Sequence, residues 1–318
     1  MRTRRMVSPG TLALSGIAAV LGAVASFGLV PVPVSAASPP AYTHSYYIQT
    51  SSTSAMQSLG ASEGAYDSGH PGYDTVFLDF GQVDYQSGAS GYGGYGAYTY
   101  GYQFVGDGGV GALVNSFAAG WYNATTSTPH LYLVVSLNNY YECFAGGGCS
   151  ISAAGSEWGS LVNAIRAYLG SVGQSWQITV RAGDDAETQW DCYPQTSAFF
   201  AGFAGNDPAN ADMLDFGNAL YGDTCLQGSS WSAYDVWLGA YQGFGPNQPF
   251  PEAYTDYHIG QWYNVYFYEG YMNFFGTMAT GSVQYSDPNA AWSAFYNKLY
   301  PVDNSLVLEG STYMEYEF

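Results

Sequence analysis

Short apolar runs alternate with longer amphipathic segments along most of this chain. The runs Thr75–Gly81, Leu131–Leu137 and Trp176–Val180 are apolar at most positions, which is typical of buried strands. Residues 108–121 and 156–170 instead repeat apolar side chains at helical spacing. Strands that are separated by helix-length segments indicate parallel βα units.

The second half of the chain continues this pattern. Seven or eight βα units within residues 71–300 fit a closed barrel better than an open sheet. The prediction is therefore an α/β fold, a (β/α)8 TIM-barrel-like single domain over residues 71–300, with an irregular or incomplete barrel as the alternative. A helix is expected at residues 290–300. The further strands are expected at Met213–Phe216, Val236–Tyr241, Glu252–Thr255 and Phe274–Met278.

The N-terminal segment has the features of a secretory signal peptide. Met1–Arg5 is basic, Leu12–Val30 is mostly apolar, and Val34–Ala36 provides the small residues of a cleavage site. We expect a signal peptide at residues 1–36 and an exported protein, secreted or associated with the cell wall, with no membrane contact after cleavage. A retained membrane anchor is the alternative.

Three other segments depart from the strand and helix patterns. Residues 37–70 are rich in Ser, Ala, Tyr and Pro, so we expect a linker or an edge segment there. Residues 85–102 are rich in Gly and Tyr, which predicts a mobile loop that offers aromatic faces, with a weak strand at Tyr98–Phe104. Residues 301–318 are expected to form a C-terminal extension.

Acidic side chains far outnumber basic ones. The chain has 25 Asp and Glu against 6 Lys and Arg, and three of those six lie in the first 36 residues. A nucleic-acid partner is not expected, because phosphate binding needs a basic face. Charged residues make up only 10% of the chain, against about 25% in an average domain. Neutralised carboxylates would leave such a chain with little charge repulsion, so we expect it to tolerate acid.

The four cysteines predict two disulfides, because an exported chain meets an oxidising environment. Three pairings are possible. We favour Cys143 with Cys149, which flank a short glycine-rich loop, and Cys192 with Cys225. Metal binding is the alternative, but the chain has no CxxC motif and no clustered histidines, so neither a metal nor another cofactor is expected.

Asp185 and Glu187 are the main candidates for catalysis. They follow the predicted strand Trp176–Val180, and residues two apart on an extended segment point to the same side. Two neighbouring carboxyl groups cannot both ionise cheaply, so one stays protonated and can donate its proton. The alternative is a pair of solvated acids in a turn. Other polar residues at the ends of predicted strands are Asp79, Asn138, Asn139, Asp184, Asp215 and Glu252.

Aromatic side chains make up 18% of the chain, and tyrosine is the most frequent of them. Sugar rings pack on aromatic faces, while their hydroxyls need amide and carboxylate partners. Trp190, Trp237 and Trp262 lie near predicted strand ends beside polar residues, so they are candidates for sugar binding. Packing in the core is the alternative for each of them. The chain has neither the histidine motif of zinc hydrolases nor the Gly-x-Ser-x-Gly elbow of esterases.

Several short motifs occur in a fixed order between residues 73 and 280. They are Leu78–Gly81, Asn138–Asn139, Gly183–Trp190, Asp235–Trp237, Phe250–Tyr254 and Gln261–Trp262. In this order they resemble a group of secreted actinobacterial proteins with a glycosidase-like (β/α) barrel. That group is distantly similar to the muramidase barrels of the glycoside hydrolase family 25 type. The last motif departs from the muramidase pattern, because Gln261 here precedes Trp262.

The resemblance implies roles for individual side chains. Glu187 matches the muramidase acid at the end of the fourth strand, Asp185 matches its partner, and Asp79 matches the aspartate that closes the first strand. Asp215 and Glu252 are the other candidates for the opposing charge. The residues expected to bind substrate are Asn138, Asn139, Asp184, Trp190, Asp215, Trp237, Glu252, Gln261 and Trp262.

The expected function is that of an exported glycoside hydrolase acting on a polysaccharide, with cell-wall glycan as one candidate. Two alternatives remain open at this point. One is a surface protein that binds glycan without cleaving it. The other is a structural protein of the cell envelope that adheres through its Tyr- and Gly-rich surface.

Overall fold

Parallel strands form a nearly closed barrel in the part of the chain that the structure describes. The structure is a computed structural model, and it describes residues 37–315 except 71, 88–93, 127, 142–148, 208–212, 246 and 282. The predicted signal peptide at residues 1–36 lies outside the described residues. Among these described residues, no helix is both long enough and apolar enough to cross a membrane.

Eight strands make up the barrel, and neighbouring strands in it pair in parallel. Their order around the sheet is β8-β7-β6-β5-β2-β1-β10-β9. This arrangement confirms the predicted α/β, TIM-barrel-like fold. The strands are β1 (Thr43–Tyr47), β2 (Tyr73–Tyr85), β5 (His130–Asn138), β6 (Ile178–Asp185), β7 (Met213–Asp215), β8 (Gln248–Pro249), β9 (Gly276–Thr280) and β10 (Gly310–Glu315).

The barrel is irregular where β8 meets β9. β8 is only two residues long, and the chain after it continues beside β9 as irregular backbone. The N–H of Met278 donates to the carbonyl of Pro251 at 2.9 Å, and the N–H of Ala253 donates to the carbonyl of Met278 at 2.9 Å. Glu252 lies between Pro251 and Ala253, so these bonds bring it onto the wall of the barrel.

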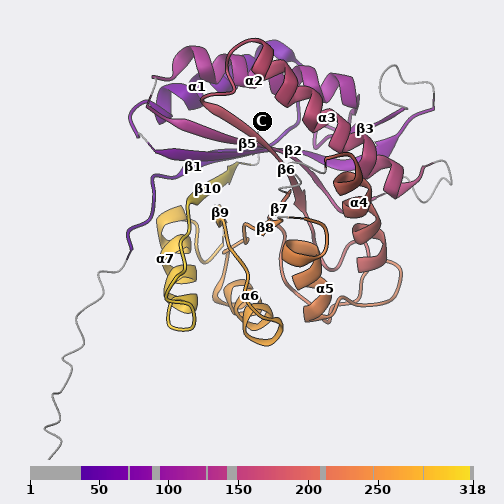
Figure 1. The fold of residues 1–318 in the computed structure, drawn as a ribbon, viewed down its shortest axis with the longest axis vertical. Helices are drawn as coiled ribbons and strands as arrows, with labels where there is room; N and C mark the ends of the chain where they lie inside the picture. The colour runs from indigo at the N-terminus through magenta and orange to yellow at the C-terminus, as the bar shows by residue number, and fades with distance from the viewer. Residues whose placement is uncertain are drawn as a thin grey trace, which may run out of the picture. The chain divides into compact units, whose positions relative to one another are not determined.

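Helices cover the outside of the barrel (Figure 1). α1, α2 and α3 lie over β1, β2 and β5, and the later helices lie beside the later strands. The helices are α1 (Thr53–Asp67), α2 (Asp107–Ala124), α3 (Ile151–Ser171), α4 (Tyr193–Asn206), α5 (Ala233–Trp237), the π-helical turn η2 (Leu238–Gln242), α6 (Asp256–Glu269) and α7 (Pro288–Leu299).

Apolar side chains fill two separate layers. The first lies between the helices and the outer face of the sheet, where Trp121 and Trp158 are almost fully buried. The second fills the inside of the barrel, where Phe77, Phe250 and Met314 meet. Burying one such large side chain contributes about 1.5–3 kcal/mol to folding. In β2, Asp79 lies two positions beyond Phe77, so the same inward face changes from apolar to acidic toward the end of the strand.

The barrel includes more of the chain than the sequence predicted. Residues 37–70 are not a linker or an edge segment, since they supply β1 and α1, and residues 301–318 supply β10 rather than an extension. β1 lies between β10 and β2. Buried hydroxyl groups connect β1 to β10, because the Ser45 and Thr312 side chains hydrogen bond at 2.7 Å. Such polar strands lack the apolar signal on which the prediction depended.

Other predictions were wrong in secondary structure. The segment Glu252–Thr255 is not a strand, since only Glu252 forms an isolated bridge, to Met278. Residues 236–241 form the end of α5 and most of η2 rather than a strand. Ser232 starts this helix with a capping box, in which its hydroxyl accepts from the N–H of Asp235 and its own N–H donates to the Asp235 carboxylate. Part of the loop expected at residues 85–102, residues 88–93, lies outside the described residues. The rest contains β3 (Tyr95–Tyr98), which pairs with β2, and a turn separates it from β4 (Phe104–Gly106), so the strand expected at Tyr98–Phe104 is not continuous.

Candidate active site

Four carboxyl groups gather at the C-terminal ends of three barrel strands. Asp79 lies in β2, Asp185 ends β6, Glu187 follows two residues later, and Glu252 comes just after β8. Carboxylate oxygens of Asp185, Glu187 and Glu252 all lie within 4.8 Å of one another. The residues are buried, with exposed fractions of 3%, 8% and 5%. The predicted convergence of Asp185 and Glu187 on one site is therefore present, and Glu252 joins them.

The Glu187 side chain is held by amide groups. Gln189 donates its Nε2–H to Glu187 Oε2 at 2.6 Å, and Asn218 donates to the same oxygen. The Asn139 side chain accepts from the backbone N–H of Glu187 at 2.9 Å and donates to its carbonyl at 3.1 Å. Asn139 thus fixes the turn that carries Glu187. It is fully buried, and its predicted contact with substrate stays a prediction.

The chain after β7 packs tightly on this turn. A side chain at Gly217 would meet the backbone of Ala186 at 2.5 Å, so only glycine fits there. The Asp215 carboxylate accepts hydrogen bonds from the backbone N–H groups of Gly217 and Ala186. Asp215 therefore holds the turn that carries Glu187, and its role as a sugar ligand or opposing charge stays a prediction.

Glu252 has a hydroxyl donor of its own. Tyr254 donates its phenolic hydrogen to Glu252 Oε1 at 2.7 Å. One oxygen of Glu252 lies within 4.8 Å of an oxygen of Glu187, so each of the two carboxyl groups affects the ionisation of the other.

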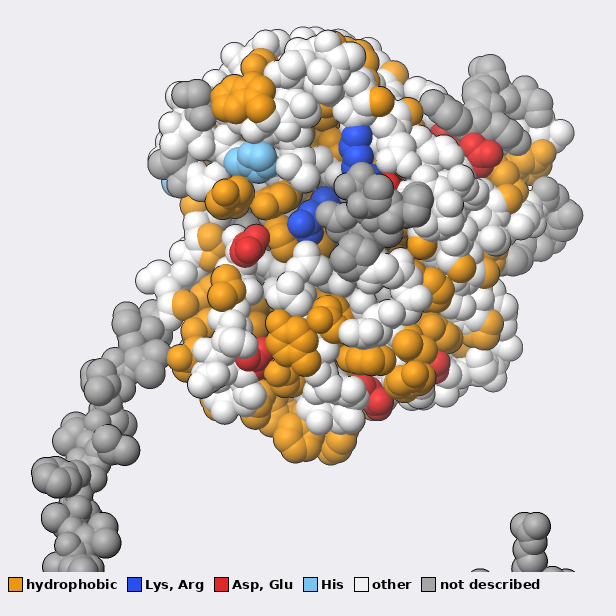
Figure 2. Space-filling view, in the orientation of Figure 1, with side chains coloured by type: hydrophobic (Ala, Val, Ile, Leu, Met, Phe, Trp, Pro, Cys, Tyr) orange, Lys and Arg blue, Asp and Glu red, His pale blue; other side chains and the backbone are white. Residues whose placement is uncertain are grey.

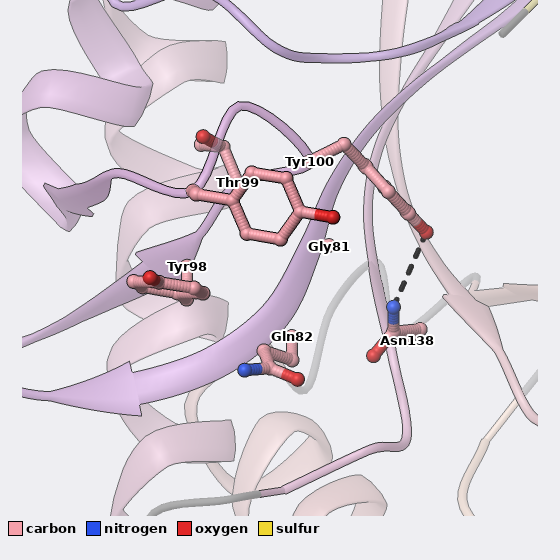
Figure 3. Close-up of a pocket in the computed structure, with 7 residues that line it drawn as sticks. Gly81, Gln82, Tyr98, Thr99, Tyr100 and Asn138 are labelled. Atoms are coloured by element: carbon pink, nitrogen blue, oxygen red, sulfur yellow. Dashed lines mark hydrogen bonds between the residues drawn. The ribbon is translucent and has the colours of Figure 1, made fainter.

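Asp79 lies near Asp185 and accepts a hydrogen bond from a tyrosine. Tyr100 donates its hydroxyl hydrogen to Asp79 Oδ2 at 2.8 Å and accepts from the Asn138 side-chain amide at 3.2 Å (Figure 3). The backbone N–H of Gly81 donates to Asp79 Oδ1 at 2.9 Å. Tyr100 and Asn138 also line a pocket of about 270 Å³ at the ends of β2 and β5. The Tyr100 hydroxyl thus connects Asp79 to the wall of an open pocket.

Burial controls the acidity of these groups. It raises the pKa of Asp79 and of Glu187 to about 7. Burial, and then the charge of Glu187, raises the pKa of Glu252 well above its ordinary value. Burial, and then the charge of Glu252, does the same for the pKa of Asp185. Near neutral pH the site therefore holds protonated carboxyl groups, which can donate a proton to a bound molecule.

Three carboxylates this close could also hold a divalent cation.

Of the remaining predicted residues, some lie near the ends of the barrel strands and others lie on the outer helices. Asn138 lines the pocket, and half-buried Trp190 lies edge-on to Tyr140 at 6.1 Å. Asp184 is fully buried, and neither of its oxygens has a hydrogen-bond partner. Trp237 lies on α5, and Gln261 and Trp262 lie on α6, so the structure does not bring these three into the site. Trp262 is a core residue, fully buried against Phe274.

Trp237 belongs instead to an aromatic surface on the outer helices. Its ring stacks on the Tyr234 ring at 5.7 Å. Figure 2 shows hydrophobic side chains gathered over α5 and α6. The exposed aromatic residues in this part of the chain are Tyr234, Tyr257, Phe267, Tyr268 and Tyr271.

One predicted disulfide is confirmed. Cys192 and Cys225 are bonded, with their Cα atoms 5.2 Å apart, and this bond suggests an oxidising, extracellular environment. Beside it, the N–H of Leu226 donates to the carbonyl of Trp190 at 2.8 Å, so the disulfide holds the loop after β7 against the end of β6. Cys149 is not a free thiol. Cys143 lies outside the described residues, and its pairing stays a prediction.

The motif that prompted the muramidase resemblance agrees with the structure only in part. β6 is the fourth barrel strand along the chain, so the Asp185–Glu187 motif lies where the resemblance requires it. Asp79 lies in the second barrel strand, not in the first as expected, because β1 precedes it. No protein-family model matches the chain, and no curated protein matches it either. The fold itself is compatible with many kinds of enzyme.

Sequence reasoning did not find Tyr100, Tyr254, Gln189 and Asn218. Tyr254 and Gln189 lie inside the motifs that carried the resemblance, two residues from Glu252 and Glu187, and this spacing was the available signal. Tyr100 lies in the Gly- and Tyr-rich segment, where nothing distinguishes it from its neighbouring tyrosines. Asn218 follows a very short strand and carried no signal, because its contact with Glu187 spans 31 residues of sequence.

Proposed function

We propose that this protein is an exported glycoside hydrolase that cleaves a polysaccharide with Glu187 and Glu252 as its two catalytic carboxyl groups. The observation that carries the proposal is the buried group of Asp185, Glu187 and Glu252, whose oxygens lie within 4.8 Å of one another. Glycosidic bond cleavage needs one carboxyl group that donates a proton and a second that faces the sugar.

The separation of the two groups favours retention of configuration. Inverting enzymes hold their carboxyl groups about 6.5–9.5 Å apart to admit a water, whereas retaining enzymes hold them about 5 Å apart. The distance between the Glu187 and Glu252 oxygens is below the inverting range. Asp79 and Asp215 are less suitable partners, because both accept backbone hydrogen bonds that hold local turns.

Hydrogen bonding favours Glu252 as the acid and Glu187 as the charged group. Two amide donors stabilise the Glu187 carboxylate, whereas burial, and then the charge of Glu187, raises the pKa of Glu252. This assignment reverses the roles that the sequence suggested. In the first step, a Glu187 oxygen bonds to the anomeric carbon, the glycosidic bond breaks, and the Glu252 proton passes to the leaving oxygen. In the second step, water displaces Glu187 and returns a proton to Glu252.

The test measures new reducing ends released from peptidoglycan, chitin, xylan and a β-glucan. Glu187→Gln and Glu252→Gln should each reduce turnover by about 100-fold or more. The exposed Glu309 provides a matched control, since Glu309→Gln should retain activity. With an activated aryl glycoside, azide should restore turnover to both Glu187→Ala and Glu252→Ala but give glycosyl azides of opposite configuration. The product is inverted from Glu187→Ala, where azide attacks the substrate, and retained from Glu252→Ala, where azide attacks the sugar bound to Glu187. Full activity in both Gln variants would exclude the proposal.

Glycan binding without cleavage is the second candidate. The observation that favours it is the burial of the carboxyl groups, together with the position of Tyr100 between the pocket and Asp79. Retention of the protein on an insoluble glycan, with no reducing ends released at any pH from 4 to 8, would support this alternative.

A further inference from the structure

The pocket beside Asp79 is built by three neighbouring segments. They are the C-terminal part of β2, the turn between β3 and β4, and the end of β5. Figure 3 shows Gln82 and Tyr98 on one side of the pocket and the Tyr100–Asn138 hydrogen bond on the other. Its volume of about 270 Å³ lies just below the ~300–1,000 Å³ of typical small-molecule sites, so it suits one ring rather than several.

The lining of the pocket combines aromatic rings with uncharged polar groups. Tyr98, Tyr100 and Tyr102 supply the rings, and Gln82 and Asn138 supply side-chain amides. None of the residues described as lining the pocket is charged. An anion would therefore find no cationic partner among these residues. This chemistry fits a neutral ligand that has one apolar face and several hydroxyl groups.

A bulge in β2 shapes one side of the pocket. The pairing of β2 with β5 changes register between Asp79 and Gln82. Gly81, which lies in this bulge, has a φ of 86°, and a side chain there would meet the carbonyl oxygen of Tyr98 at 2.6 Å. Only glycine allows the two strands to approach this closely. As a result, Asp79 takes part in the acidic group while Gln82 lines the pocket.

Tyr102 is unusual in both conformation and exposure. It is the one non-glycine residue with positive φ, at 60°, in the described part of the chain, and its exposed fraction is 82%. A tyrosine in this region is strained relative to glycine, and an exposed ring contributes little to the core. Nothing in its contacts with the fold explains why a tyrosine rather than glycine occupies this position.

The turn that carries Tyr102 is firmly anchored. The N–H of Tyr102 donates to the carbonyl of Thr99 at 2.8 Å, and the N–H of Tyr100 donates to the carbonyl of Ile48 at 3.1 Å. A side chain at Gly101 would collide with the carbonyl oxygen of Gln49. The Tyr102 ring is therefore held at the mouth of the pocket by the backbone on either side of it.

The pocket adjoins the carboxyl groups. Tyr100 bonds to both Asp79 and Asn138, and Asn138 pairs with Asp185 across the β5–β6 ladder. A ring in the pocket would thus occupy the position next to a ring at Glu187 and Glu252. We propose that this pocket is a sugar subsite that binds one neutral pyranose ring of the substrate, with Tyr102 as its stacking surface and Gln82 and Asn138 as hydrogen-bond partners of its hydroxyls. This inference rests on the proposed function for the presence of the neighbouring ring.

Binding can be measured apart from cleavage by using the full chain with Glu187→Gln. The probes are chitotetraose, cellotetraose and xylotetraose as neutral oligosaccharides, and tetragalacturonic acid as a charged one, each titrated by calorimetry. At least one neutral probe should bind, and the charged probe should not. Adding Tyr102→Gly should weaken that binding by about tenfold, because the stacking surface is lost. Tyr102→Phe should bind as the parent does, since it keeps the ring.

Two controls separate a subsite from a structural role. Tyr102→Gly should unfold at the same temperature as the parent or at a higher one, because glycine removes the strain at positive φ. Tyr268→Ala removes an equally exposed tyrosine on α6 and should leave binding unchanged. Gln82→Ala should weaken binding by a similar factor. Unchanged binding in Tyr102→Gly, absence of binding by every neutral probe, or preference for the charged probe would each overturn the proposal.

Failure of the subsite proposal can be distinguished from failure of the proposed catalytic roles. In the otherwise unaltered protein, Tyr102→Gly should raise KM about tenfold and change kcat little, because the ring acts away from the bond that breaks. If Glu187→Gln proved fully active while Tyr102→Gly still lost oligosaccharide binding, the catalytic roles would fail and the subsite would stand. If Glu187→Gln were inactive and Tyr102→Gly bound normally, the subsite would fail and the catalytic roles would stand.

Discussion

Two groups of buried acids lie at opposite ends of the barrel strands, and they differ in what surrounds them. The first is the catalytic group proposed above, around Asp185, Glu187 and Glu252. The second, which we call the α1 acid group, consists of Glu63 and Asp67 of α1 and Asp74 at the start of β2. The α1 acid group is at least as deeply buried, with exposed fractions of 1%, 0% and 2%. Burial of carboxyl groups is therefore not by itself a sign of function.

The α1 acid group has structural partners. Glu63 accepts from the backbone N–H of His44 at 2.8 Å, pairs with the His44 ring at 3.2 Å, and accepts from the Tyr46 hydroxyl at 2.9 Å. Trp121 donates to Asp67 at 2.5 Å. These contacts tie α1 and α2 to β1. In contrast, the catalytic group lies at the C-terminal ends of the strands and adjoins a pocket, and that end of a barrel is where active sites form.

The largest expected effect separates activity from stability. Glu187→Gln should remove about 100-fold or more of the polysaccharide-cleaving activity with little change in unfolding free energy. Glu63→Gln should do the opposite, lowering the free energy of unfolding by about 1–3 kcal/mol because His44 loses its charged partner. Activity assays and urea titrations of both variants measure the two effects. Equal loss of activity in the two variants would remove the distinction between the groups.

The two groups should respond alike to pH. In the folded protein, burial raises the pKa of Asp67 to about 8, and that of Asp74, Asp79 and Asp215 to about 7. These values exceed the ~3.9 of unfolded aspartate, so the folded state binds the protons more tightly. Their contribution to stability is therefore complete below about pH 4 and is lost as pH rises through about 7 to 8.

Unfolding by urea should accordingly require more denaturant at pH 5 than at pH 9. The difference in unfolding free energy should exceed about 3 kcal/mol, because one pKa unit corresponds to about 1.4 kcal/mol and several groups contribute. Asp67→Asn should reduce this difference without affecting the pH dependence of cleavage. A profile that is highest near neutral pH and collapses below pH 4 would contradict the prediction.

Two tyrosine hydroxyls offer a matched comparison of smaller size. Tyr46→Phe removes the donor to Glu63, and Tyr254→Phe removes the donor to Glu252. Each should lower the unfolding free energy by about 0.5–1.5 kcal/mol, which is the usual contribution of one hydrogen bond. Only Tyr254→Phe should also shift the pH profile of kcat, because Tyr254 acts on the ionisation of a catalytic group. A profile identical to that of the parent would show that Tyr254 has only a structural role.

The smallest effect concerns divalent cations. The proposed reaction moves protons and a covalent bond between carboxyl groups and sugar, so EDTA should leave the rate of cleavage unchanged. The α1 acid group should be equally insensitive, as measured by the unfolding temperature with and without added Ca²⁺ or Mn²⁺. A rise in unfolding temperature with either ion that disappears in Glu252→Gln would instead identify the group of Asp185, Glu187 and Glu252 as a metal site.

The sequence by itself determined the elements whose own residues are apolar and periodic. β2, β5 and β6 and the helices α2 and α3 were predicted, as were the positions of Asp79, Asp185 and Glu187 relative to them. The Cys192–Cys225 bond was predicted as well. Each of these follows from local information, because the spacing of apolar side chains along a segment indicates how that segment will be buried.

Only the tertiary structure decided which distant residues meet. β1 and β10 close the barrel through buried hydroxyl groups, and polar strands of this kind leave no apolar pattern to read. Glu252 and Tyr100 reach the carboxyl groups because the barrel brings the ends of strands that are far apart in sequence around one axis. The sequence therefore supplied the acids. The closure of the barrel determined which acids lie together and where the pocket lies, because both depend on distances that no local pattern encodes.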